Sequence, residues 1–252
     1  FAQKTITVAK DSSGDFKTVQ AAINAIPSPN KVPVTIIIKA GIYKETVKID
    51  SGKNFITLKG DPQNKTLITF SNHVGSKLYN GEILNIMNCA TFIIYANDFH
   101  AENIHFENKA GFYAGQAVAV RAEGNRISFR RCLITGSRNV LFLSGSGVKQ
   151  YFENCFIQGT TDFICGGATA VFKKCRLHNK SNSHITAAST RSSIPFGFVF
   201  FDCDLTADEG LNNVSLGRPW EPNASVTYIN CVMGKHIIPE GWNNWKNPHN
   251  EA

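Results

Sequence analysis

The chain has 252 residues, of which 42% are hydrophobic and 18% charged, and its formal net charge is +7. This length and composition predict one folded domain, residues 1–252, with a large core. No run of 18 or more apolar residues occurs, so we expect no membrane span. The basic residues are scattered, which argues against nucleic acid and favours an acidic polysaccharide as the polyanionic partner.

Four Asn-x-Ser/Thr sequons together indicate a secretory route. They begin at Asn64, Asn179, Asn213 and Asn223, and we take all four as glycosylation candidates. No signal peptide is visible, so in a secreted protein it would precede Phe1. The seven cysteines include no Cys-x-x-Cys pair, and the histidines show no His-Glu-x-x-His spacing. We therefore assign no metal and no cofactor.

The first predicted element is a short amphipathic helix. Apolar residues recur at helical spacing from Val19 to Ile26, and Pro27 closes the segment. We expect this helix to cap one end of the molecule. Residues 34–39 are almost continuously apolar and predict a buried strand. At the other end, the polar residues 243–252 predict a loosely packed tail.

The rest of the chain repeats. Five segments share an aromatic residue, two spacers, a cysteine, one spacer and an aliphatic residue: Phe129/Cys132/Ile134, Phe152/Cys155/Ile157, Phe172/Cys175/Leu177, Phe200/Cys203/Leu205 and Tyr228/Cys231/Met233. Short β-rich units at this spacing predict an all-β parallel β-solenoid, in which equivalent residues stack about 4.8 Å apart. An inward ladder of cysteines would lie beside an aromatic ladder. Each cysteine fits either a small buried hydrophobe or half of a disulfide.

The repeat also places polar residues in phase. Asn139 follows Cys132 by seven residues, as Asp162 follows Cys155, and Gln116 precedes Asn139 by 23. We expect Gln116, Asn139 and Asp162 to form one polar column on one face of the solenoid. A purely structural ladder of turn residues is the alternative.

Five ordered motifs, from about residue 6 to residue 245, make the chain resemble a plant pectin methylesterase. They are Gly41–Glu45, Gly115–Ala119, Gly159–Ile164, Leu216–Trp220 and Pro239–Trp242. The resemblance implies a right-handed parallel β-helix that is secreted to the plant cell wall as a monomer. It also implies homogalacturonan (pectin) as the ligand and makes a pectin methylesterase inhibitor protein a candidate partner.

The resemblance assigns roles to three residues of the site. Asp162 matches the nucleophile that attacks the methyl-ester carbonyl, and Arg218 matches the arginine that holds this carboxylate ionised and oriented. Gln116 matches a glutamine that donates to the developing oxyanion.

Four aromatic residues are candidates for the sugar groove: Trp220, Trp242, Phe142 and Phe163. Trp220 and Trp242 could instead be plain core residues, because tryptophan is usually well buried. The resemblance further implies a disulfide between Cys175 and Cys203, since plant members commonly bridge the matching pair. We expect Cys132, Cys155 and Cys231 to be free and buried.

The sequence departs from the family at the second catalytic strand. Where the family reads Gln-Asp, this chain has Arg138-Asn139. The family's aspartate is a general acid and base, and an amide cannot replace it in proton transfer, a loss worth about 10²–10⁴-fold in rate. Losing the glutamine removes an oxyanion donor, worth roughly 10²–10³-fold in rate, and Arg138 offers a cation as a partial substitute. Cys165 also replaces an aromatic residue of the family's Phe-Ile-Phe-Gly-Asn run.

Two functional hypotheses follow. In the first, the protein is a non-catalytic relative that binds pectin, with Arg138 attracting galacturonate carboxylates. In the second, it is a weak or remodelled pectinesterase that uses Asp162 as the nucleophile. Other β-helical polysaccharide enzymes fit less well, because neither the acidic calcium cluster of pectate lyases nor the aspartate trio of polygalacturonases can be placed here.

Overall fold

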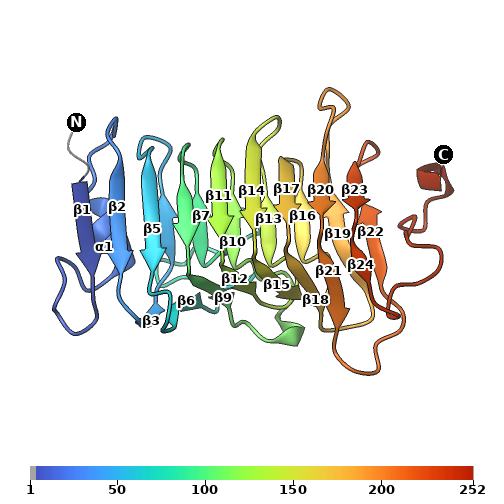
Figure 1. Ribbon diagram of the computed structural model, residues 1–252, viewed down its shortest axis with the longest axis horizontal. Helices are drawn as coiled ribbons and strands as arrows, with labels where there is room; N and C mark the ends of the chain where they lie inside the picture. The colour runs from blue at the N-terminus through green and yellow to red at the C-terminus, as the bar shows by residue number, and fades with distance from the viewer. Residues whose placement is uncertain (1–3, 252) are drawn as a thin grey trace.

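Short parallel strands stack coil upon coil along one axis in the computed structural model, which describes residues 4–251 (Figure 1). The prediction of a parallel β-solenoid is confirmed. The first sheet contains, in spatial order, β1 (Lys4–Val8), β2 (Val34–Ile38), β5 (Ile56–Gly60), β8 (His100–Glu102), β11 (Ile127–Arg130), β14 (Lys149–Glu153), β17 (Thr169–Lys173), β20 (Phe198–Phe201) and β23 (Val226–Ile229).

Two further sheets complete each coil. The second contains β4 (Val47–Ile49), β7 (Phe92–Ile94), β10 (Val120–Ala122), β13 (Leu141–Leu143), β16 (Ile164–Gly166), β19 (His184–Ala188) and β22 (Ser215–Pro219). The third contains β3 (Gly41–Lys44), β6 (Thr66–Phe70), β9 (His105–Asn108), β12 (Leu133–Thr135), β15 (Phe156–Gly159), β18 (Arg176–Asn179), β21 (Asp204–Ala207) and β24 (Val232–Met233). Two 3₁₀ helices, η1 (Phe112–Ala114) and η2 (Pro248–Glu251), lie outside the sheets. No helix within residues 4–251 has the length and apolar character needed to cross a membrane.

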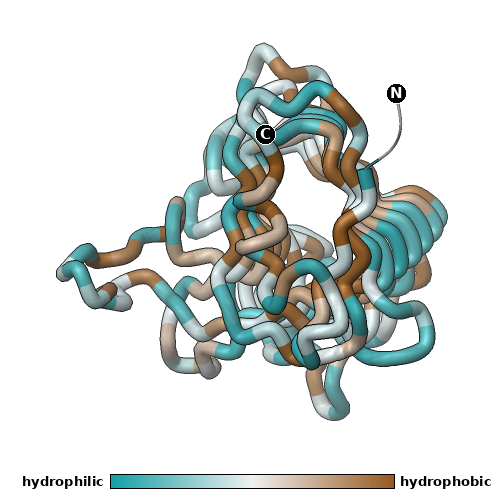
Figure 2. The backbone as a smooth tube through the Cα atoms, turned by 90° about the vertical axis from the view of Figure 1, so that its left-hand side faces the viewer, coloured by the Kyte–Doolittle hydropathy of each residue, from teal (hydrophilic) through white to brown (hydrophobic). Residues whose placement is uncertain are grey.

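An aromatic ladder fills the centre of the solenoid. Phe129, Phe152, Phe172, Phe200 and Tyr228 stack ring on ring, with centroids 4.5–5.0 Å apart and planes within 16° of parallel. Figure 2 looks down the stack and shows the coils superimposed, with hydrophobic residues along their inner walls. Such pairs add about 0.5–1.5 kcal/mol each beyond the area they bury. The predicted inward aromatic ladder is confirmed.

The capping helix is α1 (Val19–Asn24), at the N-terminal end of the stack (Figure 1). Thr18 closes its first turn by accepting a hydrogen bond from the amide of Ala21. The carboxylate of Glu45 accepts from the amides of Val19 and Gln20, both at 2.9 Å. Two of the four unpaired amides at a helix start are thus satisfied by the coil beneath. This contact gives the glutamate of the Gly41–Glu45 motif a structural role.

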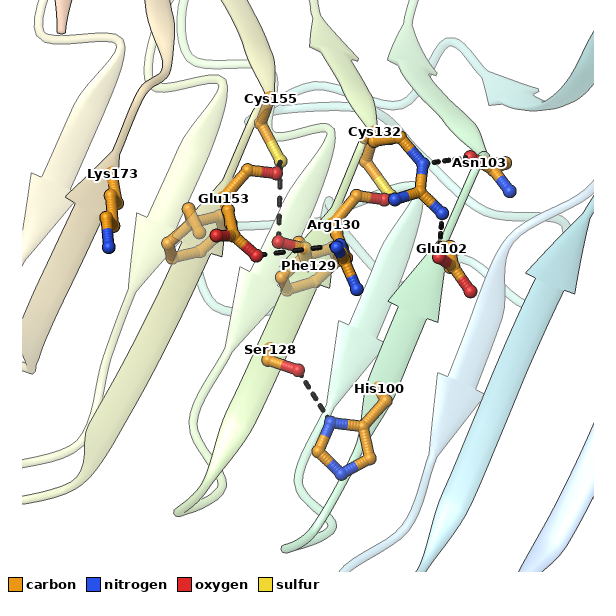
Figure 3. Close-up of polar contacts among 12 residues, drawn as sticks. His100, Glu102, Asn103, Ser128, Phe129, Arg130, Cys132, Glu153, Cys155 and Lys173 are labelled. Atoms are coloured by element: carbon orange, nitrogen blue, oxygen red, sulfur yellow. Dashed lines mark hydrogen bonds and ion pairs between the residues drawn. The ribbon is translucent and has the colours of Figure 1, made fainter. Parts of the chain in front are cut away.

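The outer face of the first sheet holds paired charges (Figure 3). Arg131 forms an ion pair with Glu102, and Arg130 lies 3.5 Å from the carboxylate of Glu153. Arg130 and Arg131 are one of the two longest basic runs in the chain, and both are neutralised by carboxylates of neighbouring coils. The basic excess that would attract a polyanion therefore lies elsewhere.

The predicted disulfide between Cys175 and Cys203 is wrong for this structure, in which both are free thiols. Each thiol instead has two backbone carbonyls within hydrogen-bond distance. One carbonyl belongs to the preceding coil, and the other belongs to the residue two positions earlier in the chain. In-register parallel strands hold equivalent Cβ atoms about 4.8 Å apart. A disulfide needs Cβ atoms roughly 3.5–4.5 Å apart. Cys132 and Cys155 are free and buried as expected, whereas Cys231 is free but only half-buried.

Thiol titration tests this correction. In denaturant without reductant, an aromatic disulfide reagent should react with all seven cysteines, and in the native protein Cys231 should react first because it alone is not fully buried. If the denatured protein has two fewer reactive thiols than expected, and reductant restores them, Cys175 and Cys203 are bridged after all.

Candidate active site

Asn139 and Asp162 occupy equivalent corners of successive coils, each just before a strand of the second sheet. Both have left-handed backbone conformations, with φ of 57° and 48°. Asn and Asp adopt this region more readily than other side-chain-bearing residues. The amide of Asn139 donates to Thr161 and that of Asp162 donates to His184, so each corner hydrogen-bonds to the next coil. The predicted alignment of Asn139 with Asp162 is confirmed.

Gln116 lies one position out of this alignment. It pairs with Arg138, the residue before Asn139. The coil that carries Gln116 has one extra residue before β10, where two successive amides, beginning at Ala119, donate to the carbonyl of Val140. This is the geometry of a bulge, and it changes the offset between the two coils from 21 residues at Val120 to 22 at Gln116, still short of the 23 that separate Asn139 from Asp162. The predicted column of three is therefore wrong at Gln116, which neighbours Arg138 instead.

Asp162 forms the central ion pair of the site with Arg218. The guanidinium donates Nε to one carboxylate oxygen at 2.9 Å and Nη2 to the other at 2.6 Å. The Asp162 side chain is only 3% exposed. Arg218 lies on β22, two coils beyond Asp162, and the small side chain of Ala187 occupies the intervening outward position. This bidentate contact orients the carboxylate and also favours its ionised form.

Trp245 holds the other face of Arg218. The guanidinium carbon lies 3.7 Å from the centre of its indole ring, within the range of a strong cation–π contact. The expectation of a loosely packed tail over 243–252 is wrong at this residue; Ala252 lies outside the described residues. A tryptophan between otherwise polar neighbours was the signal in the sequence, because such a residue seldom lacks a packing partner.

Asn139 fills its position without an acid–base group. Its side-chain nitrogen donates to the carbonyl of Asp162 at 3.3 Å and to the sulfur of Cys165 at 3.4 Å, and its buried oxygen has no partner in the structure. Burial raises the pKa of the Cys165 thiol to about 12, so it stays protonated at neutral pH. Neither side chain can shuttle a proton under ordinary conditions.

Arg138 is exposed beside these residues and brings a positive charge to the site. Within residues 4–251, no group of three or more His, Cys, Asp or Glu side chains is arranged to hold a metal ion.

Two of the four predicted groove aromatics lie on the surface. Trp220 is 38% exposed and Trp242 is 47% exposed, so the alternative that they are plain core residues is wrong. Phe142 is nearly buried and supports Trp220, with ring centres 5.9 Å apart. Phe163 is completely buried in the core, because the residue after the corner points inward. Its assignment to the groove is therefore wrong.

A cleft of about 850 Å³ adjoins the ion pair on its C-terminal side. Its lining includes Arg218, Trp242, Glu240 and Thr186. The arginine that orients Asp162 thus also forms part of the wall of an open cleft.

The four sequons differ in accessibility. Asn64, Asn213 and Asn223 are exposed. Asn179 is fully buried at the end of β18, and its amide nitrogen has no room for a glycan. The predicted glycosylation of Asn179 is wrong for the folded protein.

His184 is a site residue that the motifs did not reveal. It follows Asp162 on the next coil, and its Nδ1 lies 2.7 Å from the hydroxyl of Ser215. Burial lowers the pKa of His184, and the positive charge of Arg218 lowers it further, while Asp162 acts in the opposite direction. The signal was the coil spacing itself, which places His184 22 residues after Asp162.

Comparisons with known proteins agree with this geometry. The pectinesterase family model matches residues 5–251. The chain is 37% identical to Pectinesterase 31 of Arabidopsis thaliana, over 98% of this chain and 79% of that protein. The chain belongs to the pectinesterase family. Its structure is similar to that of a pectin methylesterase from carrot, with a TM-score of 0.88 and 33% identity over 97% of this chain and 78% of that one.

A second solved pectinesterase, a pectin methylesterase in complex with a hexasaccharide, has the same TM-score of 0.88 at 28% identity, over 96% of this chain and 82% of that one. The shared architecture is the right-handed parallel β-helix. Four other Arabidopsis pectinesterases are longer, and the chain spans between 43% and 65% of their lengths.

The contribution of the Asp162–Arg218 ion pair to stability can be tested by unfolding. Arg218→Met should lower the free energy of unfolding by about 3 kcal/mol or more, because it leaves the Asp162 carboxylate buried without a partner. Adding Asp162→Asn should restore part of that loss in urea denaturation.

Arg176→Met is the matched control, since Arg176 pairs with Asp204 at 3.7 Å on the exposed face of the third sheet. It should cost less than about 1 kcal/mol. A double variant no more stable than Arg218→Met alone would show that the buried charge is not the source of the loss.

Proposed function

We propose that this protein binds homogalacturonan of the plant cell wall and hydrolyses its methyl esters far more slowly than a pectinesterase with the full acid–base set. The observation that carries this proposal is the contrast between two neighbouring corners. The Asp162–Arg218 ion pair is complete, whereas Asn139 occupies the acid–base corner with an amide. Binding and the nucleophile are retained, and proton transfer is impaired.

The surface of the site fits an acidic sugar polymer. Trp220 and Trp242 expose aromatic faces that can pack against sugar rings, and Arg138 supplies an unburied positive charge beside them. A related pectin methylesterase has been solved with a hexasaccharide. Secretion to the cell wall is part of the proposal and accords with the three exposed sequons. We also expect a pectin methylesterase inhibitor protein to dock on this face, because its tryptophans offer apolar contact area.

The chemistry available to the chain follows from these positions. The Asp162 carboxylate attacks the ester carbonyl carbon, and Arg138 lies where it can attract the oxygen that becomes negative. The carbon–methoxy bond then breaks, leaving an anhydride on Asp162. The methoxy oxygen needs a proton to leave as methanol, and Asn139 has none to give. A remodelled, active esterase is the second candidate, favoured by the intact ion pair and the positive charge of Arg138.

Binding can be tested on immobilised pectins. Retention on homogalacturonan should weaken as salt rises, because the attraction is largely electrostatic. It should strengthen as the polymer is de-esterified and more carboxylates become available. Arg138→Gln should reduce this preference, whereas Arg176→Gln, which makes the same charge change on the third sheet, should not. Equal retention on a neutral glucan, or none on pectin at low salt, would contradict the proposed ligand.

Methanol release tests the missing acid. Asn139→Asp should raise the rate by about 10²-fold or more, because a positioned acid–base group commonly contributes that much. Adding Arg138→Gln should raise it further by returning a neutral oxyanion donor, and the two effects should not add, because both act on one transition state.

Arg138 can also pair with the new carboxylate and keep it ionised, in which case only the double variant gains activity. A native rate as high as that of Asn139→Asp would contradict the impaired esterase and support the remodelled one.

A further inference from the structure

We infer that His184 is the catalytic proton carrier of the slow ester hydrolysis in this protein, acting from the side of Asp162 opposite Asn139. The inference rests on the proposed function, because it requires Asp162 as the nucleophile. It assigns a role to a titratable side chain that the Asp162–Arg218 mechanism leaves unused.

The register places His184 beside the ion pair. The coil of Asp162 pairs with the coil of His184, through the hydrogen bond from the Asp162 amide to the His184 carbonyl at 2.8 Å. The coil of His184 pairs in turn with that of Arg218, where Ala187 lies opposite the arginine. The ion pair therefore spans the coil that carries the imidazole. An ester carbon in front of Asp162 has Asn139 on one flank and His184 on the other, each one coil away.

The hydrogen bonds favour one tautomer of the His184 ring. The Ser215 hydroxyl lies 3.4 Å from the carbonyl of Gly217 and donates to it. Its oxygen is therefore placed to accept a hydrogen bond from the Nδ1–H of His184, at 2.7 Å. This tautomer leaves Nε2 with a lone pair that can take a proton. Of the charged groups, Asp162 and Arg218 are the two that act on the ring, and they come from the two flanking coils.

The steps balance with His184 as the carrier. As the Asp162 carboxylate bonds to the ester carbon and the carbon–methoxy bond breaks, the methoxy oxygen takes a proton from Nε2 of the imidazolium and leaves as methanol. Water then attacks the acyl carbon of the anhydride and gives a proton to Nε2. This step frees Asp162 and a galacturonic acid, which ionises in solvent. Arg138, beside Asn139 on the other flank, supplies an exposed positive charge that can attract the carbonyl oxygen as it becomes negative.

The same arrangement explains why hydrolysis is slow at neutral pH. The leaving group needs the imidazolium form, and the pKa of His184 lies below its usual value because of burial and Arg218. Only a small fraction of the rings is therefore charged near pH 7. The rate should rise as pH falls from about 8 to about 5, because protonation of His184 supplies the missing acid.

The experiment measures methanol release from methylated pectin across that pH range. His184→Gln should lose at least about tenfold in rate and should lose the rise towards acid pH. His105→Gln is the matched control: it is another partly buried histidine, hydrogen-bonded to a threonine hydroxyl at 2.7 Å but on the third sheet. It should change the rate by less than about twofold.

Two further variants separate catalysis from folding. Imidazole added to His184→Ala should restore part of the rate, because a free base can enter the space left by the ring. In an Asn139→Asp background, His184→Gln should cost less than about twofold, since the new carboxyl supplies the proton.

Three results would overturn the inference: native-like hydrolysis by folded His184→Gln, a native rate that is flat or falls towards acid pH, or no methanol release by the native protein at any pH. Salt-dependent retention on homogalacturonan would, in each case, leave the proposed pectin binding intact.

Discussion

In-register stacking of parallel coils is the constraint on which the rest of this structure depends. Each coil has an apolar edge that it cannot bury alone, so neighbours must stack, and the interstrand hydrogen bonds fix the step at about 4.8 Å. Inward positions then form ladders such as the rings from Phe129 to Tyr228. Outward positions form columns by the same geometry. The site is therefore assembled from residues far apart in sequence, with spacings set by coil length.

The ion pair shows what this geometry demands of its neighbours. Burying a carboxylate lowers the stability of the folded protein unless the carboxylate is well paired. The partner of Asp162 is Arg218, which lies two coils further along the stack. The strand between them places the small residue Ala187 opposite Arg218, and the ring of Trp245 packs on the guanidinium. The site thus depends on residues that have no chemistry of their own.

The sequence predicted the parts of the molecule that follow from periodicity. The stack, the aromatic ladder, the capping helix and the alignment of Asn139 with Asp162 all follow from repeated spacings, and the structure confirms them. The misses come from local departures from the period. Gln116 pairs with Arg138, an offset of 22 residues rather than the 23 that separate Asn139 from Asp162, and no cysteine marks the coil of Gln116 to show this in advance.

Other misses concern where a side chain points or what it packs against. The motif around Asp162 does not indicate that the side chain of Phe163 points into the core. The sequon at Asn179 likewise does not indicate that this residue is buried in β18. Motifs identify chemistry, whereas exposure depends on the three-dimensional packing. The cysteine pair failed for a geometric reason, because adjacent coils hold the side chains parallel rather than converging.

The replacement of the acid–base residue by Asn139 preserves a hydrogen-bonding pattern that a carboxyl group could form only when protonated. The amide nitrogen donates to the carbonyl of Asp162 and to the sulfur of Cys165. The carbonyl could not donate in return to a carboxylate, whereas the protonated Cys165 thiol could. A protonated carboxyl group at position 139 could donate one hydrogen bond to the carbonyl of Asp162. An ionised carboxylate there would be repelled by that carbonyl oxygen, because both carry negative charge. Asn139 therefore mimics the protonated, resting form of an acid but cannot release a proton. Under the proposed function, a site held in that form keeps the surroundings that would receive the polymer and lacks, at Asn139, the proton that methanol needs in order to leave.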